Sequence, residues 1–203
     1  MKRRFDSAHP LQKYKMIIGI TGTNGSGKDT LAKILVRRLN YPHFSLSDEL
    51  REICHEKNIL PSRENLTNLG NELRQEFGSD YLSLRILGKT KDNFIVTSIR
   101  NPKEIEPFKE IGKFVLISLT APIETRYQRI VENKHRSGEK IGESKTSFTD
   151  FNAQENREMK GESFSQQLGQ LMAIADINIS NEGTIEELDN EVDKLIIKLG
   201  LKL

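Results

Sequence analysis

A glycine-rich loop between an apolar run and an amphipathic segment constrains most strongly what this chain can fold into. Residues 16–20 (MIIGI) form a nearly continuous apolar run, which is typical of a strand covered on both faces of a sheet. The loop at residues 22–30 (GTNGSGKDT) follows directly, and residues 30–39 then repeat apolar side chains with helical spacing. The order strand, glycine-rich loop and helix predicts the start of a βαβ unit.

The spacing inside this loop predicts a cradle for phosphate groups. Gly22, Gly27 and Lys28 match the pattern G-x-x-x-x-G-K, with a third glycine between the first two. Glycines let consecutive backbone N–H groups point into one concavity, and the helix that begins there adds its positive end. Lys28 would reach the outer phosphates as a point charge. The chain departs from the usual ending of this pattern, because Asp29 follows the lysine and Thr30 comes one residue later.

Four further strands, alternating with helices, are predicted along the chain. Short apolar runs indicate strands at residues 43–46, 93–99, 114–119 and 176–180. Ser47-Asp48 and Pro61-Ser62 are possible caps, and a helix is predicted after each of them. Apolar residues with helical spacing, together with breaks at Gly or Pro, indicate further helices at residues 81–87, 103–111, 122–133, 151–175 and 185–199. This alternation predicts an α/β fold with a parallel sheet, whose ligands bind at the carboxyl ends of the strands.

Charge balance and cysteine content exclude several classes of protein. The chain has 31 Lys plus Arg against 29 Asp plus Glu, a formal net charge of +2, so it carries no strong signal for nucleic-acid binding. A single cysteine, Cys54, permits no intrachain disulfide and predicts a reducing compartment, the cytoplasm. No apolar stretch approaches the ~18 residues of a membrane span, and no apolar region follows the basic start as in a secretory signal.

Length and composition predict one domain with an N-terminal arm. Residues 1–15 are polar and basic and show no periodicity, so we expect a flexible basic arm there. Residues 16–203 are expected to form a single domain.

Five segments, in order after residue 16, resemble the nucleoside monophosphate kinase group of P-loop kinases. Residues 22–30 have the spacing GxxGxGKxT of adenylate kinases and end in G-K-D-T, as in phage-type deoxynucleoside monophosphate kinases. HFSLSDELRE (43–52), FIVTSIRNPKE (94–104) and APIETRYQRI (121–130) resemble the adenylate kinase segments around the acceptor site and before the lid. ADINISNEGTIEEL (175–188) resembles the last strand and loop of dephospho-CoA kinases, which run beside the adenine.

The resemblance implies a three-layer P-loop kinase fold, in which a five-stranded parallel sheet has helices on both faces and a small lid. It places acceptor-binding helices at about residues 47–88 and the lid region at about residues 133–157. It also implies ATP and Mg²⁺ as cofactors. The residues expected to bind them are Gly22, Asn24, Gly25, Ser26, Gly27, Lys28, Asp29, Thr30, Arg126 and Gly183, with Thr30 and Asp29 at the metal.

On the acceptor side, the resemblance implies a cluster of cations around the transferred phosphoryl group. Lys28, Arg100 and Arg129 are the expected catalytic residues. The expected substrate-binding residues are Asp48, Arg51, Arg100, Arg136 and Arg157. Polar side chains between residues 53 and 81, among them Arg63 and Arg74, are expected to line the acceptor pocket.

Several of these residues have simpler structural interpretations. Asp48 is also a natural helix N-cap, and Arg51 is placed to pair with a nearby glutamate. Asp29 is equally a first-turn acid facing the helix dipole. The metal-linked acid of the family falls near Thr97, which is not acidic, so that duty shifts to Asp29 or Asp48.

The function expected from the sequence is ATP-dependent phosphoryl transfer to a nucleoside or deoxynucleoside monophosphate. A second hypothesis keeps the fold and changes the acceptor to dephospho-CoA or another small phosphorylated metabolite. A third is an ATP-binding regulator that transfers nothing. The expected partner is a small-molecule phosphate acceptor, and the sequence leaves the oligomeric state open.

Overall fold

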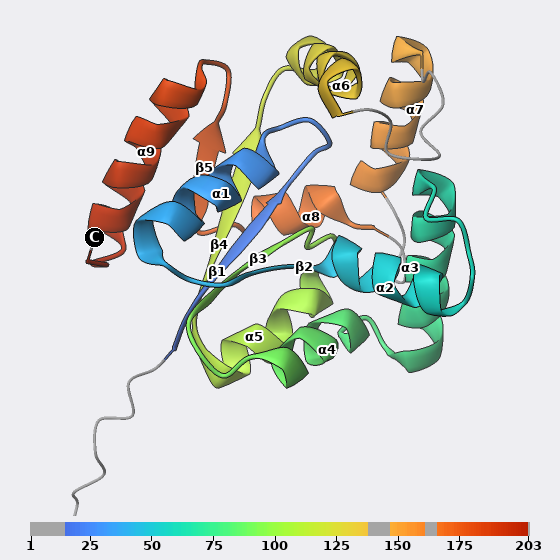
Figure 1. The fold of residues 1–203 in the computed structure, drawn as a ribbon, viewed down its shortest axis with the longest axis horizontal. Helices are drawn as coiled ribbons and strands as arrows, with labels where there is room; N and C mark the ends of the chain where they lie inside the picture. The colour runs from blue at the N-terminus through green and yellow to red at the C-terminus, as the bar shows by residue number, and fades with distance from the viewer. Residues whose placement is uncertain (1–14, 138–146, 161–165, 203) are drawn as a thin grey trace, which may run out of the picture.

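The computed structural model describes residues 15–137, 147–160 and 166–202, with side chains for all but 133–137. A parallel sheet runs through the middle of the molecule (Figure 1). Its strands are β1 (Lys15–Gly22), β2 (His43–Ser45), β3 (Phe94–Thr97), β4 (Gly112–Thr120) and β5 (Ile177–Ser180), in the order β2-β3-β1-β4-β5. The predicted five-stranded parallel sheet is therefore confirmed.

Alternation along the central strand divides the core between two faces. Helices α1 (Lys28–Leu39) and α9 (Ile185–Lys198) cover one face of the sheet. Met16, Ile18 and Ile20 of β1 lie in the core on that face. Ile17 lies in the core of the opposite face. That face is covered by α2 (Leu46–Glu56), α3 (Arg63–Phe77), α4 (Tyr81–Lys89), α5 (Glu106–Ile111) and α8 (Leu168–Ala173). These are the two helical layers that the sequence predicts.

Two more helices, α6 (Ile123–Ser137) and α7 (Phe148–Met159), stand at the end where the strands terminate (Figure 1). Tyr127 of α6 makes edge-on and tilted ring contacts with Phe148 and Phe151 of α7. These contacts hold α7 over the same edge of the sheet as the glycine-rich loop. The predicted lid at residues 133–157 includes residues 138–146, which lie outside the described part of the chain, and it stays a prediction.

The structure corrects three local predictions. The helix after β2 begins at Leu46 with Ser45 at its N-cap position, so Asp48 lies in the first turn and does not cap it. The segment 103–111 is a 3₁₀ helix, Pro102–Ile105, followed by α5, because Asn101 and Glu104 form a capping box around the proline. The segment 151–175 contains two helices, α7 and α8.

The boundaries of α3 agree with those that the sequence predicts. Ser62 caps α3 by accepting a hydrogen bond from the Asn65 amide, and the helix ends at Gly78. The predicted arm falls mostly on residues 1–14, outside the described residues, and the single-domain prediction is not tested further. No helix in the described part of the chain is long and apolar enough to cross a membrane.

Candidate functional site

The carboxyl ends of all five strands meet at one edge of the sheet and position the candidate site. The glycine-rich loop follows β1, and the turn that carries Arg100 follows β3. Helices α2 and α6 follow β2 and β4, and the loop with Asn181 follows β5. Parallel strands deliver ligand-binding residues to this edge, because every strand ends there.

The glycine-rich loop presents unused backbone donors. Gly27 adopts a left-handed conformation with φ of 99°, and a Cβ atom there would collide with the side-chain amide of Asn181. Inside α1, the first backbone bond runs from the Leu31 amide to the Gly27 carbonyl at 3.0 Å. The amides of residues 27–30 donate to no described residue. A concavity of free N–H groups at a helix N-terminus is a site for anionic oxygens.

Lys28 lies within this concavity and lacks a carboxylate partner among the described residues. Its Nζ donates to the Thr23 carbonyl at 2.6 Å. Burial, and then the positive charge of Arg100, lower the pKa of Lys28 from 10.5 to about 7. Arg63 lowers it further, while Asp29 and Glu158 oppose the shift. Burial and nearby positive charge disfavour the ammonium form of Lys28, and a bound polyanion would stabilise that form.

Asn181, from the loop after β5, supports the glycine-rich loop from the side. Its Nδ2 donates to the Ser26 carbonyl at 2.8 Å. Arg129 in turn donates to the carbonyl oxygens of Asn181 at 3.0 Å and Gly183 at 3.3 Å. The structure therefore brings the predicted residues Arg129 and Gly183 together, with the arginine bonded to backbone. A catalytic role for Arg129 stays a prediction.

Arg126 connects the glycine-rich loop with helices α6 and α7. Its guanidinium donates to the carbonyls of Ala121 at 2.7 Å and Asn24 at 3.2 Å, and it forms a bidentate ion pair with Glu155. Its residue is only 4% exposed, and the guanidinium lies over the Phe151 ring at 5.8 Å. Arg126 is therefore not part of a solvated basic face.

The turn after β3 holds Arg100 by means of a buried carboxylate. Glu104 Oε2 accepts from the amides of Arg100 at 2.7 Å and Asn101 at 3.1 Å. Glu104 Oε1 accepts from Nε and Nη2 of Arg74 at 3.0 and 2.9 Å, and both side chains are buried. Arg74 therefore supports this turn from the interior and does not line an acceptor pocket.

The Arg100 side chain meets a second arginine through Glu158 of α7. Arg100 Nη1 donates to Glu158 Oε2 at 3.0 Å and to Gln166 Oε1 at 2.7 Å. Arg63, at the start of α3, donates through Nη2 to Glu158 Oε1. Burial would raise the pKa of Glu158, but Arg100 and Arg63 outweigh it and lower the pKa below its usual value. Glu158 is therefore held in its ionised form between two cations.

Asp29, Asp48 and Arg51 lie toward the β2 side of the site. Arg51 Nη1 donates to Asp48 Oδ1 at 2.8 Å and to Ser47 Oγ at 2.9 Å, all within α2. Asp29 and Asp48 are exposed, and both act electrostatically on His43, whose pKa is nevertheless lowered by burial. Assignment of Arg51 and Asp48 to the acceptor stays a prediction.

The donor atoms near the loop fit a magnesium ion that is bound mainly through phosphates. Thr97, where the family acid would fall, is buried, and its hydroxyl lies 2.9 Å from His43 Nε2. No group of three or more metal-ligating side chains occurs among the described residues. Mg²⁺ typically takes only one or two protein oxygens and completes its shell with water and phosphate. The Thr30 hydroxyl and the Asp29 carboxylate offer oxygens of that kind.

The remaining predicted residues form none of these contacts, or their side chains are undescribed. Arg157 is exposed on α7 and forms no ion pair with a described residue. The side chain of Arg136 lies outside the described part of the chain. Their roles stay predictions.

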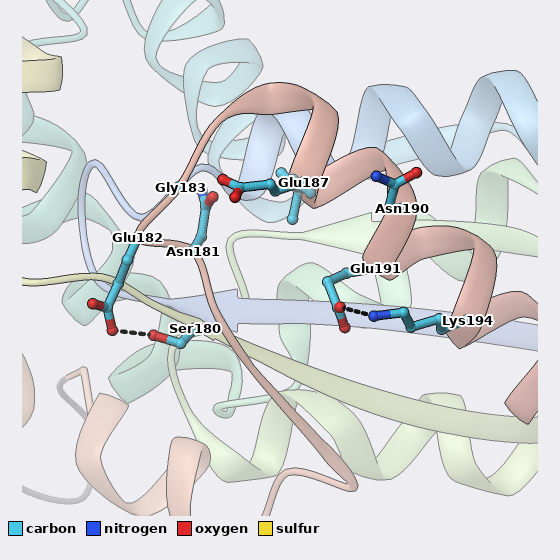
Figure 2. A pocket seen from close by; sticks show the side chains of 9 residues that line it. Ser180, Asn181, Glu182, Gly183, Glu187, Asn190, Glu191 and Lys194 are labelled. Atoms are coloured by element: carbon cyan, nitrogen blue, oxygen red, sulfur yellow. Dashed lines mark hydrogen bonds and ion pairs between the residues drawn. The ribbon is translucent and has the colours of Figure 1, made fainter.

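A pocket of about 590 Å³ opens between the loop after β5 and one face of α9 (Figure 2). Glu182, Glu187 and Glu191 line it, and the charge of Glu191 is met by Lys194 at 2.5 Å. Glu187 is also committed to the capping box of α9, where it accepts from the Thr184 amide. Three carboxylates disfavour phosphate in this pocket, whereas the glycine-rich loop presents free backbone donors.

Sequence reasoning missed the carboxylates that hold the arginines. Glu155 and Glu158 are three residues apart, so they face the same side of α7, and Glu104 lies four residues after Arg100. The i, i+3 spacing of the two glutamates was a signal for one charged helix face. Their arginine partners are 29 to 95 residues away in sequence, and no local pattern identifies them.

Comparison with solved structures places the fold among P-loop kinases. The Thermus thermophilus protein TT1252 superposes with a TM-score of 0.57 at 22% identity, covering 92% of this chain and 99% of that one. Shikimate kinase from Bacteroides thetaiotaomicron gives a TM-score of 0.55 at 18% identity over 90% and 98% of the two chains. A gluconokinase from Sinorhizobium meliloti gives 0.51 at 14% identity over 93% and 95%. At these identities the likeness shows the fold alone.

Sequence comparison shows the family. The AAA domain family matches residues 18–160. A UPF0200 protein from Hyperthermus butylicus is 30% identical over 190 residues, covering 92% of this chain and 96% of the relative. A UPF0200 protein from Thermococcus sibiricus is 28% identical over 196 residues, covering 92% and 97%. The chain therefore belongs to the UPF0200 family and carries an AAA domain with the P-loop kinase fold.

Proposed function

We propose that this protein is an ATP-dependent kinase that transfers the terminal phosphoryl group of ATP to a nucleoside or deoxynucleoside monophosphate. The products would be ADP and the corresponding diphosphate. The proposal deepens what the fold and the family support, which is a phosphotransferase of the P-loop kinase type.

One observation carries the proposal: cations outnumber anions where the glycine-rich loop faces the Arg100 turn. Lys28, Arg63 and Arg100 act electrostatically on one another there, and the carboxylates of Asp29 and Glu158 oppose them. Burial and the neighbouring guanidiniums lower the pKa of Arg100, with Glu158 and Glu104 opposing the shift. Such an excess of positive charge is stabilised when anionic groups bind, as two nucleotide phosphates would.

The same charges favour a phosphate acceptor over a hydroxyl acceptor. Transfer to a hydroxyl is usually assisted by a carboxylate that accepts the hydroxyl proton. Glu158 is unsuited to that duty, because two arginines bind it and its pKa is lowered. A phosphate acceptor is already ionised and needs cations to hold it in line with the donor.

The residues of this chain would divide the work between donor and acceptor. The free amides of residues 27–30 and Lys28 would hold the donor phosphates, and Thr30 and Asp29 would hold Mg²⁺. Magnesium bound there would neutralise charge on the transferred group. Arg100, fixed by Glu104, would orient the acceptor phosphate with planar, paired hydrogen bonds. Arg126 would support the donor site, because its guanidinium donates to the Asn24 carbonyl of the glycine-rich loop.

A coupled assay of ADP release over a panel of acceptors tests the proposal. The panel contains the ribo- and deoxynucleoside monophosphates, dephospho-CoA, and shikimate as a hydroxyl acceptor that lacks phosphate. We expect at least one nucleoside monophosphate to raise ADP release well above the background ATPase rate. Stimulation by dephospho-CoA alone would favour the second hypothesis, in which the acceptor is dephospho-CoA or another small phosphorylated metabolite. ATP binding without stimulation by any acceptor would favour a non-catalytic regulator.

A further inference from the structure

Glu158 joins two arginines that reach the site from distant parts of the chain. Its Oε2 accepts from Arg100 Nη1 at 3.0 Å, and its Oε1 accepts from Arg63 Nη2. Arg100 is 58 residues away in sequence, and Arg63 is 95 residues away. The Glu158 side chain is only 7% exposed. The carboxylate therefore fixes the relative position of α3, the turn after β3 and α7.

The two guanidiniums would separate without a carboxylate between them. Arg63 acts on Arg100 as a like charge, and Arg74 adds to that repulsion from the interior. Glu158 is the carboxylate bonded to both Arg63 and Arg100, while Glu104 serves the backbone of Arg100. A shared carboxylate between two arginines overcomes their repulsion and also limits their rotamers.

Glu158 leaves most donors of the two arginines unused. Among the described residues, no hydrogen bond uses Nε or Nη2 of Arg100, or Nε or Nη1 of Arg63. The Arg63 Nε is buried and has no hydrogen-bond partner in the described part of the chain. A buried donor without an acceptor is costly, and a bound anion or a water molecule would satisfy it. On Arg100 the free Nε and Nη2 form one edge that fits two oxygens of a phosphate, and on Arg63 the free Nη1 offers a further donor.

We propose that Glu158 is a positioning residue that aligns Arg63 with Arg100, and that Arg63 is the second arginine to contact the phosphate of the acceptor. This inference rests on the proposed function. It assigns to Arg63 the part that the sequence gives to Arg51, whose guanidinium is bonded within α2 to Ser47 and Asp48. Arg63 also acts electrostatically on Lys28, so the pair of arginines faces the donor side of the site.

The opposite interpretation makes Glu158 a competitor that occupies the phosphate position. A competitor would occupy the Nε–Nη2 edge that a phosphate needs, but on Arg100 Glu158 bonds to Nη1 and leaves that edge free. The two interpretations predict opposite signs. Loss of the carboxylate charge weakens phosphate binding if Glu158 positions the arginines, and strengthens it if Glu158 competes.

Inorganic phosphate is the probe, with the donor site filled beforehand. The full-length protein is saturated with Mg²⁺ and the non-hydrolysable ATP analogue AMP-PNP, and phosphate is then titrated by calorimetry. We expect Glu158→Gln to weaken phosphate binding about tenfold or more, which is the loss typical for charge-assisted hydrogen bonds. Glu158→Asp keeps the charge but is one methylene shorter, so it cannot span both arginines and should weaken binding as well.

Matched variants separate positioning from a general loosening of the fold. Glu155→Gln, on the same face of α7 but paired with Arg126, should leave phosphate affinity within about twofold of the wild type. Arg63→Gln should weaken phosphate binding more than Arg51→Gln. In the Arg63→Gln background, Glu158→Gln should lose most of its effect, because the pair it aligns is already broken. Melting temperatures of all variants are measured alongside.

The outcomes distinguish this inference from the proposed function. If AMP-PNP does not bind the wild-type protein, the proposed function fails first. If AMP-PNP binds but Glu158→Gln binds phosphate as well as or better than the wild type, the inference is overturned and the kinase proposal stands. Additive effects of Arg63→Gln and Glu158→Gln would also overturn it. If Glu158→Gln does not fold, Glu158→Asp and the Arg63 and Arg51 pair decide the question.

Discussion

The loop after β1 offers free backbone donors, whereas the arginines beside it are already bonded to carboxylates of the same chain. The amides of residues 27–30 donate to no described residue, and Lys28 Nζ donates to the Thr23 carbonyl. Arg100 and Arg63, by contrast, share Glu158 as a partner. The donor side is thus prepared by backbone conformation, and the acceptor side by long-range ion pairs. The difference predicts that the two sides respond differently to substitution.

The largest effect is expected on the donor side. Lys28→Met should reduce the rate of phosphoryl transfer by about 10³-fold, because no ammonium group would then neutralise the negative charge of the outer ATP phosphates. Lys33→Met, which removes an exposed lysine from the same helix, should leave turnover near the wild-type value. Steady-state ADP release with a responsive acceptor measures both. Equal turnover in the two variants would remove Lys28 from the account.

Removing the Lys28 charge should not unfold the protein. The folded state lowers the pKa of Lys28 from 10.5 to about 7. The unfolded chain therefore binds more protons between these values, so the lysine opposes folding below pH 10.5, and fully so below pH 7. The melting temperature of Lys28→Met at pH 7 should equal or exceed that of the wild type. A large decrease would mean that Lys28 has a structural role.

The second effect concerns stability on the acceptor side. Glu104→Gln leaves Arg74 buried without its counter-charge and should lower the free energy of unfolding by about 3 kcal/mol, at the lower end for a broken buried pair. Glu191→Gln breaks an exposed pair with Lys194 and should cost less than about 0.5 kcal/mol. Urea denaturation of the two variants gives the comparison. Similar losses would show that the turn after β3 does not depend on its buried carboxylate.

The third effect separates acceptor from donor in the kinetics. Arg100→Lys keeps the charge but loses the planar pair of donors, so the KM for the acceptor should rise about tenfold or more. The KM for ATP should change by less than about twofold, because the loop after β1 is intact. Initial rates over both substrate concentrations measure the two constants. An equal rise in both would contradict the assignment of Arg100 to the acceptor.

The smallest effect is a proton taken up when the donor binds. Because the pKa of Lys28 in the free protein is about 7, the ammonium form is scarce at pH 8. Bound phosphates raise that pKa, so binding of Mg·ATP should take up roughly 0.9 proton at pH 8 and roughly 0.1 at pH 6. Calorimetry in buffers of different ionisation enthalpy measures the uptake. Lys28→Met should show almost none, and uptake that persists in this variant would assign the proton to another group.

The contrast between the two sides also explains what the sequence predicts and what it does not. The loop, its flanking strand and helix, and the cap and stop of α3 depend on neighbouring residues, so local spacing identifies them. Residue types favour Ser47-Asp48 as the cap of α2, because the apolar pattern does not show that β2 ends at Ser45. Glu104, Glu155 and Glu158 look like ordinary helical acids until the fold brings their arginines to them. Side-chain pairs of this kind depend on tertiary structure.

Calorimetric titration of the purified protein with Mg·ATP tests the central claim most directly, because the claim is that free amides and Lys28 bind a polyphosphate. We predict saturable one-to-one binding to the wild type, retained in Lys33→Met and strongly weakened in Lys28→Met. Absence of heat at several temperatures, together with no retention of ATP in equilibrium dialysis, would contradict the account.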